Sequence, residues 1–165
     1  MEIERKYLVP VLPEGLETFT HTDIEQGYLC TSPTLRIRKM GAACILTVKE
    51  RMHTDSTAIV NREEEFVLAD DRYALLRTKC DGNMVSKTRY RIPLGNGLTA
   101  ELDIFHGSHE GLRIVEVEFP STEVSEAFVP PAWFGREVSG DRRYSNSWLS
   151  MHGNGTATDE YTETA

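Results

Sequence analysis

Hydrophobic and polar residues alternate with a period of two along most of the chain. Gly, Pro, Asn and Asp separate the alternating segments, and these residues favour turns. The pattern is typical of β-strands that are connected by turns. We therefore predict eight strands, which span Glu2–Leu8, Asp23–Cys30, Thr34–Lys39, Ala43–Glu50, Ile59–Leu68, Asn83–Pro93, Thr99–Phe105 and Arg113–Pro120.

Two stretches instead repeat their apolar residues at helical spacing. The first is predicted to begin with Asp70 or Asp71 as its N-cap and to end before Gly82. The second spans Thr122–Phe128 and has Ser121 as its N-cap. Both are short, so we expect them to cover a sheet. The apolar side of the first consists of Tyr73, Leu75 and Leu76.

The end of the chain differs from the rest. Residues 150–165 have no hydrophobic periodicity, and they include acidic residues but no Lys or Arg. The remainder contains no internal repeat and no convincing boundary between domains. We predict one domain over residues 1–149 and a disordered acidic tail over residues 150–165.

Charged residues lie two positions apart on many of the predicted strands, so they share one face of each strand. For a single strand, the better interpretation is a sheet whose charged face is solvated. Across the set of strands, however, the two charged residues on one face usually have the same sign. Arg is also often preferred to Lys, as expected where a guanidinium group must bind an oxyanion. Eight strands also suffice to close a barrel around a small ligand. We therefore predict a mainly β (α+β) fold: an eight-stranded antiparallel closed β-barrel, charged inside, with a few short covering helices.

A barrel of this kind would enclose a basic set and an acidic set of side chains. Burying charge costs several kcal/mol per ion unless it is paired. The basic set therefore requires a polyanion, and carboxylates without His or Cys favour Mg²⁺ or Mn²⁺. A metal-bound polyphosphate would satisfy both sets. The basic set is Lys6, Arg36, Arg38, Lys49, Lys87 and Arg89, with Arg91 as a further candidate. The acidic set is Glu2, Glu4, Glu63, Glu65, Glu101, Asp103, Glu116 and Glu118.

Composition excludes several other classes of function. The 18 Lys and Arg against 26 Asp and Glu give a net charge of −8, which argues against a nucleic-acid partner bound by bulk positive charge. The charged faces also lack the aromatic residues that an oligonucleotide-binding barrel uses for stacking. No apolar run is long enough to span a membrane, and the amino terminus is charged, so we expect a soluble cytoplasmic protein. Three distant cysteines indicate neither a disulfide framework nor a zinc site.

The charged blocks resemble, in the same order, those of the CYTH superfamily, which is also called the triphosphate tunnel metalloenzymes. Glu2–Lys6 matches the Glu-x-Glu-x-Lys signature at the amino terminus of this superfamily. The resemblance extends to about Leu149 and is closest to the short bacterial inorganic triphosphatases. The other matching blocks are Gln26–Leu29, Leu35–Arg38, Thr47–Lys49, Glu63–Glu65, Lys87–Tyr90, Glu101–Asp103, Val115–Phe119 and Asp141–Asn146.

The resemblance implies an eight-stranded tunnel that hydrolyses inorganic triphosphate to diphosphate and phosphate. Lys6 would stabilise the leaving diphosphate, and Glu2 and Glu4 would hold the metal ion that activates water. Whether one of the carboxylates instead acts directly as the general base stays open. Arg143 is preferred to Arg142 as a phosphate ligand. The implied metal ligands are Glu2, Glu4, Glu63, Glu65, Asp103, Glu116 and Glu118. The implied phosphate ligands are Lys6, Arg36, Arg38, Lys49, Lys87, Arg89 and Arg143.

Several alternatives stay open at this point. On the same fold, the protein could be a nucleoside or thiamine triphosphatase or a class IV-type adenylate cyclase. Outside enzymes, it could be a polyphosphate-binding module. Aromatic residues make up only 8% of the chain, and no aromatic cluster for an organic ring is evident, which favours the smallest substrate. The oligomeric state is open, with a homodimer among the options.

Overall fold

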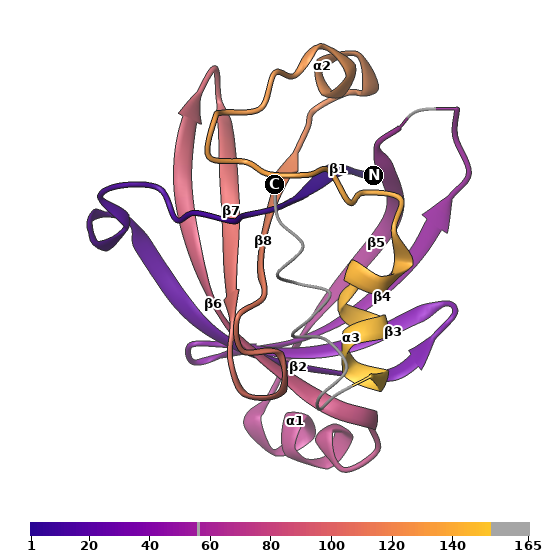
Figure 1. Ribbon diagram of the computed structural model, residues 1–165. Helices are drawn as coiled ribbons and strands as arrows, with labels where there is room; N and C mark the ends of the chain where they lie inside the picture. The colour runs from indigo at the N-terminus through magenta and orange to yellow at the C-terminus, as the bar shows by residue number, and fades with distance from the viewer. Residues whose placement is uncertain (56, 153–165) are drawn as a thin grey trace.

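The structure is a computed structural model that describes residues 1–55 and 57–152 (Figure 1). Its strands form one closed antiparallel barrel in the order β1-β5-β4-β3-β2-β6-β7-β8. The predicted eight-stranded barrel is therefore confirmed. The strands are β1 (Glu2–Leu8), β2 (Thr20–Thr31), β3 (Thr34–Met40), β4 (Ala43–Met52), β5 (Ile59–Leu68), β6 (Asp81–Gly95), β7 (Leu98–Phe105) and β8 (Arg113–Glu118).

Strand β1 closes the barrel because it pairs with β5 on one edge and with β8 on the other. The register places Glu4 directly across from Glu118 and Lys6 directly across from Glu116. Side chains directly opposite each other point to the same side of a sheet. The charged faces of neighbouring strands therefore meet on one side, which is the interior of the barrel.

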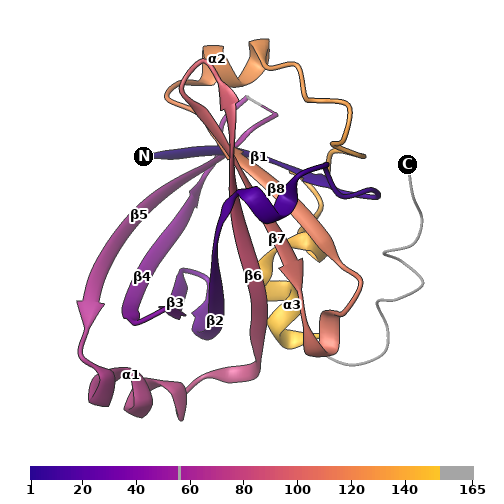
Figure 2. The ribbon, with the colours of Figure 1, turned by 90° about the vertical axis from the view of Figure 1, so that its left-hand side faces the viewer.

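Short helices lie around the barrel, and α1 and α2 occupy its opposite ends (Figures 1 and 2). No helix within the described residues is long and apolar enough to cross a membrane. The helices within residues 1–55 and 57–152 are α1 (Asp70–Arg77), α2 (Thr122–Ala127), α3 (Asn146–Met151) and the short 3-10 helices η1 (Leu16–Thr18), η2 (Gly107–His109) and η3 (Arg142–Tyr144).

The start predicted for the first helix is wrong by one or two residues. Ala69 occupies the N-cap position of α1, with no side-chain cap, and Asp70 already lies in the first turn. An acidic side chain there still interacts favourably with the helix dipole. Tyr73 is buried, whereas Leu75 is 55% exposed, so α1 buries a narrower apolar side than predicted. The predicted cap of the second helix is confirmed, because the Ser121 hydroxyl accepts a hydrogen bond from the Val124 N–H.

Helix α3 is absent from the sequence-based prediction. The Ser145 hydroxyl caps it by accepting a hydrogen bond from the Trp148 N–H, and the helix continues to Met151. It packs mainly against β6 and β2. The helix thus extends past the predicted domain end at Leu149. The rest of the predicted tail, residues 153–165, lies outside the described residues and stays a prediction.

The hydrophobic core lies outside the barrel wall, between the strands and the segments that cover them. The largest cluster joins Tyr7 of β1 and Val117 of β8 to Phe134, which lies in the segment between α2 and η3. The rings of Tyr7 and Phe134 have centroids 5.0 Å apart. Separate clusters lie under α3, around Leu149, and under α1. Because apolar burial is satisfied on the outer faces, the inner faces are left free to carry charge.

Candidate active site

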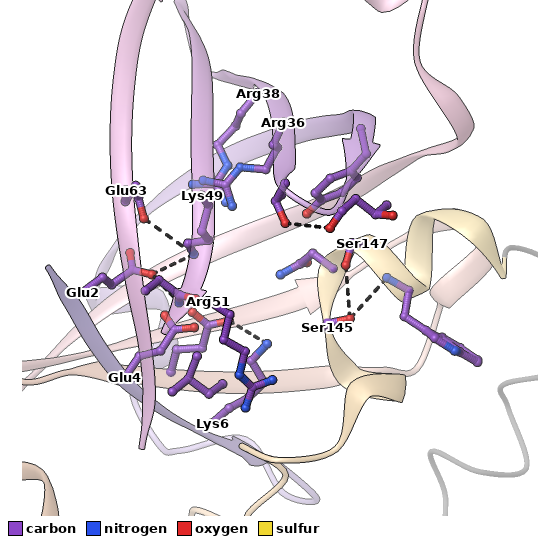
Figure 3. A pocket seen from close by; sticks show the side chains of 18 of the residues that line it. Glu2, Glu4, Lys6, Arg36, Arg38, Lys49, Arg51, Glu63, Ser145 and Ser147 are labelled. Atoms are coloured by element: carbon purple, nitrogen blue, oxygen red, sulfur yellow. Dashed lines mark hydrogen bonds and ion pairs between the residues drawn. The ribbon is translucent and has the colours of Figure 1, made fainter. Parts of the chain in front are cut away.

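A cavity of about 930 Å³ occupies the interior of the barrel (Figure 3). Its wall is built from the inward faces of the strands and from the segment that leads into α3. The structure brings most of the predicted site residues together here. The predicted residues on the wall are Glu2, Glu4, Lys6, Arg36, Arg38, Lys49, Glu63, Glu65, Arg89, Arg91, Glu101, Glu116 and Glu118.

Two arginines on β3 form the strongest anion-binding feature of the wall. Arg36 and Arg38 are both buried, and neither forms an ion pair with a carboxylate within the described residues. Arg36 donates from Nη2 to the Thr47 hydroxyl at 3.4 Å, and its buried Nε has no hydrogen-bond partner. Arg38 donates from Nε to Gln26 Oε1 at 3.1 Å. These cations therefore lack a counter-ion that an anionic ligand would supply.

The surroundings of Arg38 destabilise its charged form. Burial and the neighbouring guanidinium groups of Arg36 and Arg89 lower the pKa of Arg38 to about 10. The group remains cationic at neutral pH, but its charged form is destabilised. A bound anion would relieve both causes, because it adds an opposite charge to a set of like charges.

Two lysines lie among the carboxylates. The Lys49 ammonium is 2.7 Å from Glu2 Oε1 and 3.6 Å from Glu63 Oε2. In Figure 3 these two carboxylates lie on one side of Lys49, and the two β3 arginines lie on the other. The Lys6 ammonium is 3.4 Å from Glu116 Oε1. Both lysines therefore form ion pairs with carboxylates of the acidic part of the wall.

The carboxylates of β1 and β8 have strongly different affinities for protons. Burial, together with the charge of Glu116, raises the pKa of Glu4 to about 8. Although burial alone would raise it, the charges of Lys6 and Arg89 hold the pKa of Glu116 far below its ordinary value. Glu4 is thus a carboxylate that the wall leaves without sufficient positive charge, and burial also raises the pKa of Glu2 and of Glu118.

Lys87 and Asp103 are predicted site residues that the structure does not place on the cavity wall. Both side chains are almost completely buried, and the Lys87 ammonium is 2.7 Å from Asp103 Oδ2. Lys87 also donates to Asn146 Oδ1 at 3.1 Å. They share the inward face of their strands with Arg89, as predicted, but their side chains are buried in contacts with each other and with their neighbours. A period-two pattern cannot indicate how far along the barrel the cavity reaches.

Arg143 is the third predicted residue absent from the wall, whereas its neighbour Arg142 is part of it. The Arg143 guanidinium instead donates from Nε and Nη2 to the Asp141 carboxylate, at 3.0 and 2.7 Å. Both arginines lie in η3, where consecutive side chains point in different directions. The positions of the side chains do not support the preference for Arg143, and the sequence block contained no signal that separates the two.

The comparisons with known proteins point to one family, although no family model matches the chain. An inorganic triphosphatase from Nitrosomonas europaea is 38% identical over 154 residues, which cover 91% of this chain and 97% of that protein. An inorganic triphosphatase from Acetivibrio thermocellus is 34% identical over 152 residues, which cover 90% of this chain and 92% of that protein. This chain belongs to the inorganic triphosphatase family. The resemblance to the CYTH superfamily is thereby confirmed.

Solved structures agree with membership of the inorganic triphosphatase family. A crystal structure of an inorganic triphosphatase matches with a TM-score of 0.69 and 37% identity, and the match covers 94% of this chain and 97% of that one. A Hippeastrum protein, described as a proposed adenylyl cyclase that reveals a dominant triphosphatase activity, matches with a TM-score of 0.56 and 18% identity. That match covers 77% of this chain and 83% of the other. It shows the shared fold alone.

The acidic wall of this inorganic triphosphatase family member suits a hard divalent cation, because its donors are carboxylate oxygens. Glu63 Oε2 is buried without a hydrogen-bond partner, and Glu4 lacks sufficient positive charge. Within residues 1–55 and 57–152, no three His, Cys, Asp or Glu side chains converge to hold an ion by themselves. Mg²⁺ usually binds to one or two carboxylates together with substrate phosphates. The residues therefore fit an ion that is held jointly with a polyphosphate.

Replacing Glu4 with glutamine is expected to stabilise the metal-free protein at pH 8. Because the pKa of Glu4 is about 8 when folded and ordinarily 4.5, the folded protein binds more protons between these pH values. Glu4 therefore lowers the stability of the folded state progressively as the pH rises from 4.5 to 8. The thermal midpoint of Glu4→Gln, measured in EDTA, should rise by several degrees at pH 8 and change little at pH 5. A lower midpoint at pH 8 would contradict this assignment.

One end of the wall carries residues that the sequence analysis missed. Ser145, Ser147, Trp148 and His152 line the cavity from α3 and its flanks. The Trp148 and His152 rings are stacked, with centroids 3.8 Å apart and an interplanar angle of 9°. A spacing of four residues places two side chains together only on a helix. The pair could therefore be recognised only after α3 was known.

Proposed function

We propose that this protein hydrolyses inorganic triphosphate to diphosphate and phosphate, with Mg²⁺ or Mn²⁺ as its cofactor. The observation that carries the proposal is the buried pair Arg36 and Arg38. They have no carboxylate counter-ion among the described residues, and they lie in the same cavity as a wall of carboxylates. Such a cavity suits a small polyanion that arrives with a divalent cation. The curated relatives that carry the name inorganic triphosphatase support the same substrate.

The basic residues would bind and orient the polyanion. Phosphoryl transfer passes through a largely dissociative transition state whose charge is spread over phosphate oxygens. Arg36, Arg38 and Arg89 present guanidinium groups to the cavity, and their planar forks match phosphate oxygens. Lys6 lies at the acidic side, where it would stabilise the charge that develops on the leaving diphosphate. Because these groups are held in place before the substrate binds, little reorganisation is needed during the reaction.

The carboxylates would hold the metal ion. Glu2 and Glu4 of β1 are the first candidates, with Glu116 and Glu118 of β8 beside them, and with Glu63 and Glu65 on β5. When bound, a divalent ion offsets phosphate charge and lowers the pKa of water. Lys49 shares two of these carboxylates, so metal binding would compete with its ion pairs to Glu2 and Glu63.

A second candidate function is hydrolysis of an organic triphosphate. The stacked rings of Trp148 and His152 lie on the cavity wall, where they could contact a base or a thiazolium ring. The sequence alone revealed no such aromatic pair. Inorganic triphosphate stays the first choice, because the buried arginines require phosphate groups and the aromatic pair is not needed for them.

Phosphate release from four compounds tests the proposal. Inorganic triphosphate, diphosphate, ATP and thiamine triphosphate would each be incubated with Mg²⁺, with Mn²⁺ and with EDTA. We expect the fastest release from inorganic triphosphate, at least a hundredfold loss in EDTA, and recovery when metal is added back. Equal or faster turnover of ATP or thiamine triphosphate would favour the second candidate. Tight binding of triphosphate that stays intact would instead indicate a polyphosphate-binding module.

Two further expectations are unaffected by these arguments. A cytoplasmic location remains a prediction from the sequence, and the oligomeric state remains open, with a homodimer among the options. Cell fractionation would test the first, and light scattering of the purified protein would test the second.

A further inference from the structure

Asp103 occupies an unusual position for an acidic residue of this barrel. It lies on the inward face of β7, directly across from Arg89 of β6. Its side chain is 1% exposed and does not line the cavity, whereas the side chain of Arg89 does. The carboxylate therefore lies behind the guanidinium group as seen from the cavity.

The Asp103 carboxylate is fully engaged by two cations. Its Oδ1 accepts a hydrogen bond from Arg89 Nε at 2.7 Å, and its Oδ2 accepts one from Arg89 Nη2 at 2.9 Å. The same Oδ2 is 2.7 Å from the Lys87 ammonium. A bidentate contact of this kind fixes the plane of a guanidinium group as well as its position. To reach a metal ion in the cavity, Asp103 would have to break all three contacts.

Lys87 completes the support behind Arg89. Its ammonium is buried, and in addition to Asp103 it contacts Asn146 Oδ1 at 3.1 Å and lies 5.4 Å from the centre of the Phe105 ring. Of these three partners, only Asn146 lines the cavity. The contact with Asn146 also links this support to α3. Lys87 thus neutralises part of the Asp103 charge without lining the cavity itself.

From these contacts we infer that Asp103 is a positioning residue, which acts through Arg89 and directs its guanidinium group toward a bound polyphosphate. Lys87 holds Asp103 in place from behind. The Nε and Nη2 edge of Arg89 is used by Asp103, and Nη1 contacts Glu101 at 3.3 Å, near the cavity. This role differs from the metal ligation that the family resemblance implied for Asp103. The inference rests on the proposed function for the identity of the ligand.

Binding of triphosphate in EDTA tests the inference without any metal ion. Removing a negative charge near an anion by itself strengthens binding. Asp103→Asn is nevertheless expected to weaken the affinity for triphosphate at least tenfold, because Arg89 loses its bidentate partner. Glu101→Gln serves as the matched control, since it removes a carboxylate two residues away on the same strand. That carboxylate contacts Arg89 through Nη1 alone and also pairs with Arg91 at 2.9 Å. The affinity of Glu101→Gln is expected to stay equal or to increase. Unchanged or tighter binding by Asp103→Asn would overturn the inference.

A double-mutant cycle separates positioning from a general structural role. In the Arg89→Met background, Asp103→Asn is expected to change the triphosphate affinity by less than about twofold, because the residue through which it acts is missing. A similar loss in both backgrounds would overturn the inference. If Asp103→Asn does not fold, Asp103→Glu keeps the charge and moves the carboxylate by one methylene. That variant is expected to bind at least threefold more weakly, and wild-type affinity would count against the positioning role.

The side-chain Nε–H resonance of Arg89 gives a readout that needs no ligand. It can be assigned by its absence in Arg89→Met. We expect it to be protected from solvent exchange in the wild-type protein and to lose that protection in Asp103→Asn. A protein that neither bound nor cleaved triphosphate would refute the proposed function, while the resonance would still decide whether Asp103 holds Arg89. An unprotected wild-type resonance would refute the positioning role.

Discussion

Replacing Arg36 with alanine is expected to lower kcat/KM for triphosphate by about a thousandfold. Loss of one donor to a developing oxyanion typically costs ~10²–10³ in rate. Arg36 belongs at the upper end of this range, because it is buried and its Nε has no hydrogen-bond partner in the part of the chain that the structure describes. We therefore expect its Nε–H to donate to a bound ligand. Phosphate release at saturating Mg²⁺ would measure the effect.

The same substitution should leave the fold intact. Arg36 forms no ion pair within the described residues, so its removal leaves no buried carboxylate without a partner. The thermal midpoint is therefore expected to stay equal or to rise. Lys39→Ala is the matched control, because Lys39 lies on the same strand, is exposed and is directed away from the cavity. Its activity should stay within about twofold of wild type, and a comparable loss in both variants would contradict the role of Arg36.

Replacing Lys6 with methionine is expected to lower kcat/KM by at least about a hundredfold. The Lys6 ammonium is 3.4 Å from Glu116 Oε1 and donates to the Tyr144 carbonyl at 3.2 Å. It therefore joins the carboxylate wall to the segment before α3. Methionine preserves the apolar stem but removes the charge that would stabilise the leaving diphosphate. Steady-state kinetics with Mg²⁺ held in excess would measure the loss.

Stability distinguishes this variant from Arg36→Ala. Without the ammonium group of Lys6, the charge of Glu116 is left with less compensation in a largely buried setting. Breaking a buried pair in this way is strongly destabilising. The thermal midpoint of Lys6→Met should therefore fall, whereas that of Arg36→Ala should not. Arg5→Met is the control on the opposite face of β1, where Arg5 pairs with Glu137. That variant should lose stability and keep its activity within about threefold, and wild-type activity in Lys6→Met would exclude Lys6 from the reaction.

Sequence reasoning succeeded where the relevant physics is local. The direction of a strand side chain alternates with position, so Glu4 and Arg38 were predicted to face the same interior as their neighbours on other strands. The Ser121 cap was predictable for the same reason, because a cap bonds the backbone three residues away. In contrast, the start of α1 was predicted one or two residues too late, since Asp70 and Asp71 both suit an N-cap whereas Ala69 takes that position.

The depth of the cavity could not be predicted from the same pattern. Arg89 and Lys87 both face inward. However, Arg89 lines the cavity, whereas Lys87 is buried and donates to Asn146. The difference depends on α3, a helix whose only strong sequence signal is one Ser cap. Helices this short have little stability of their own and form because they pack against the rest of the protein.

The amino-acid sequence by itself determined which strand faces carry charge, because that follows from period-two alternation within single strands. The closed barrel was predicted from the number of strands and from the resemblance to the CYTH superfamily, and the family was predicted from that resemblance alone. Only the tertiary structure decided which of those charges reach a ligand. Arg142 rather than Arg143 lines the cavity, and Asp103 lies behind Arg89. Those assignments depend on contacts between β6, β7 and the segment around α3, which are distant in the sequence. The strength of an ion pair is set by separation and burial in space, and neither quantity is a property of one strand.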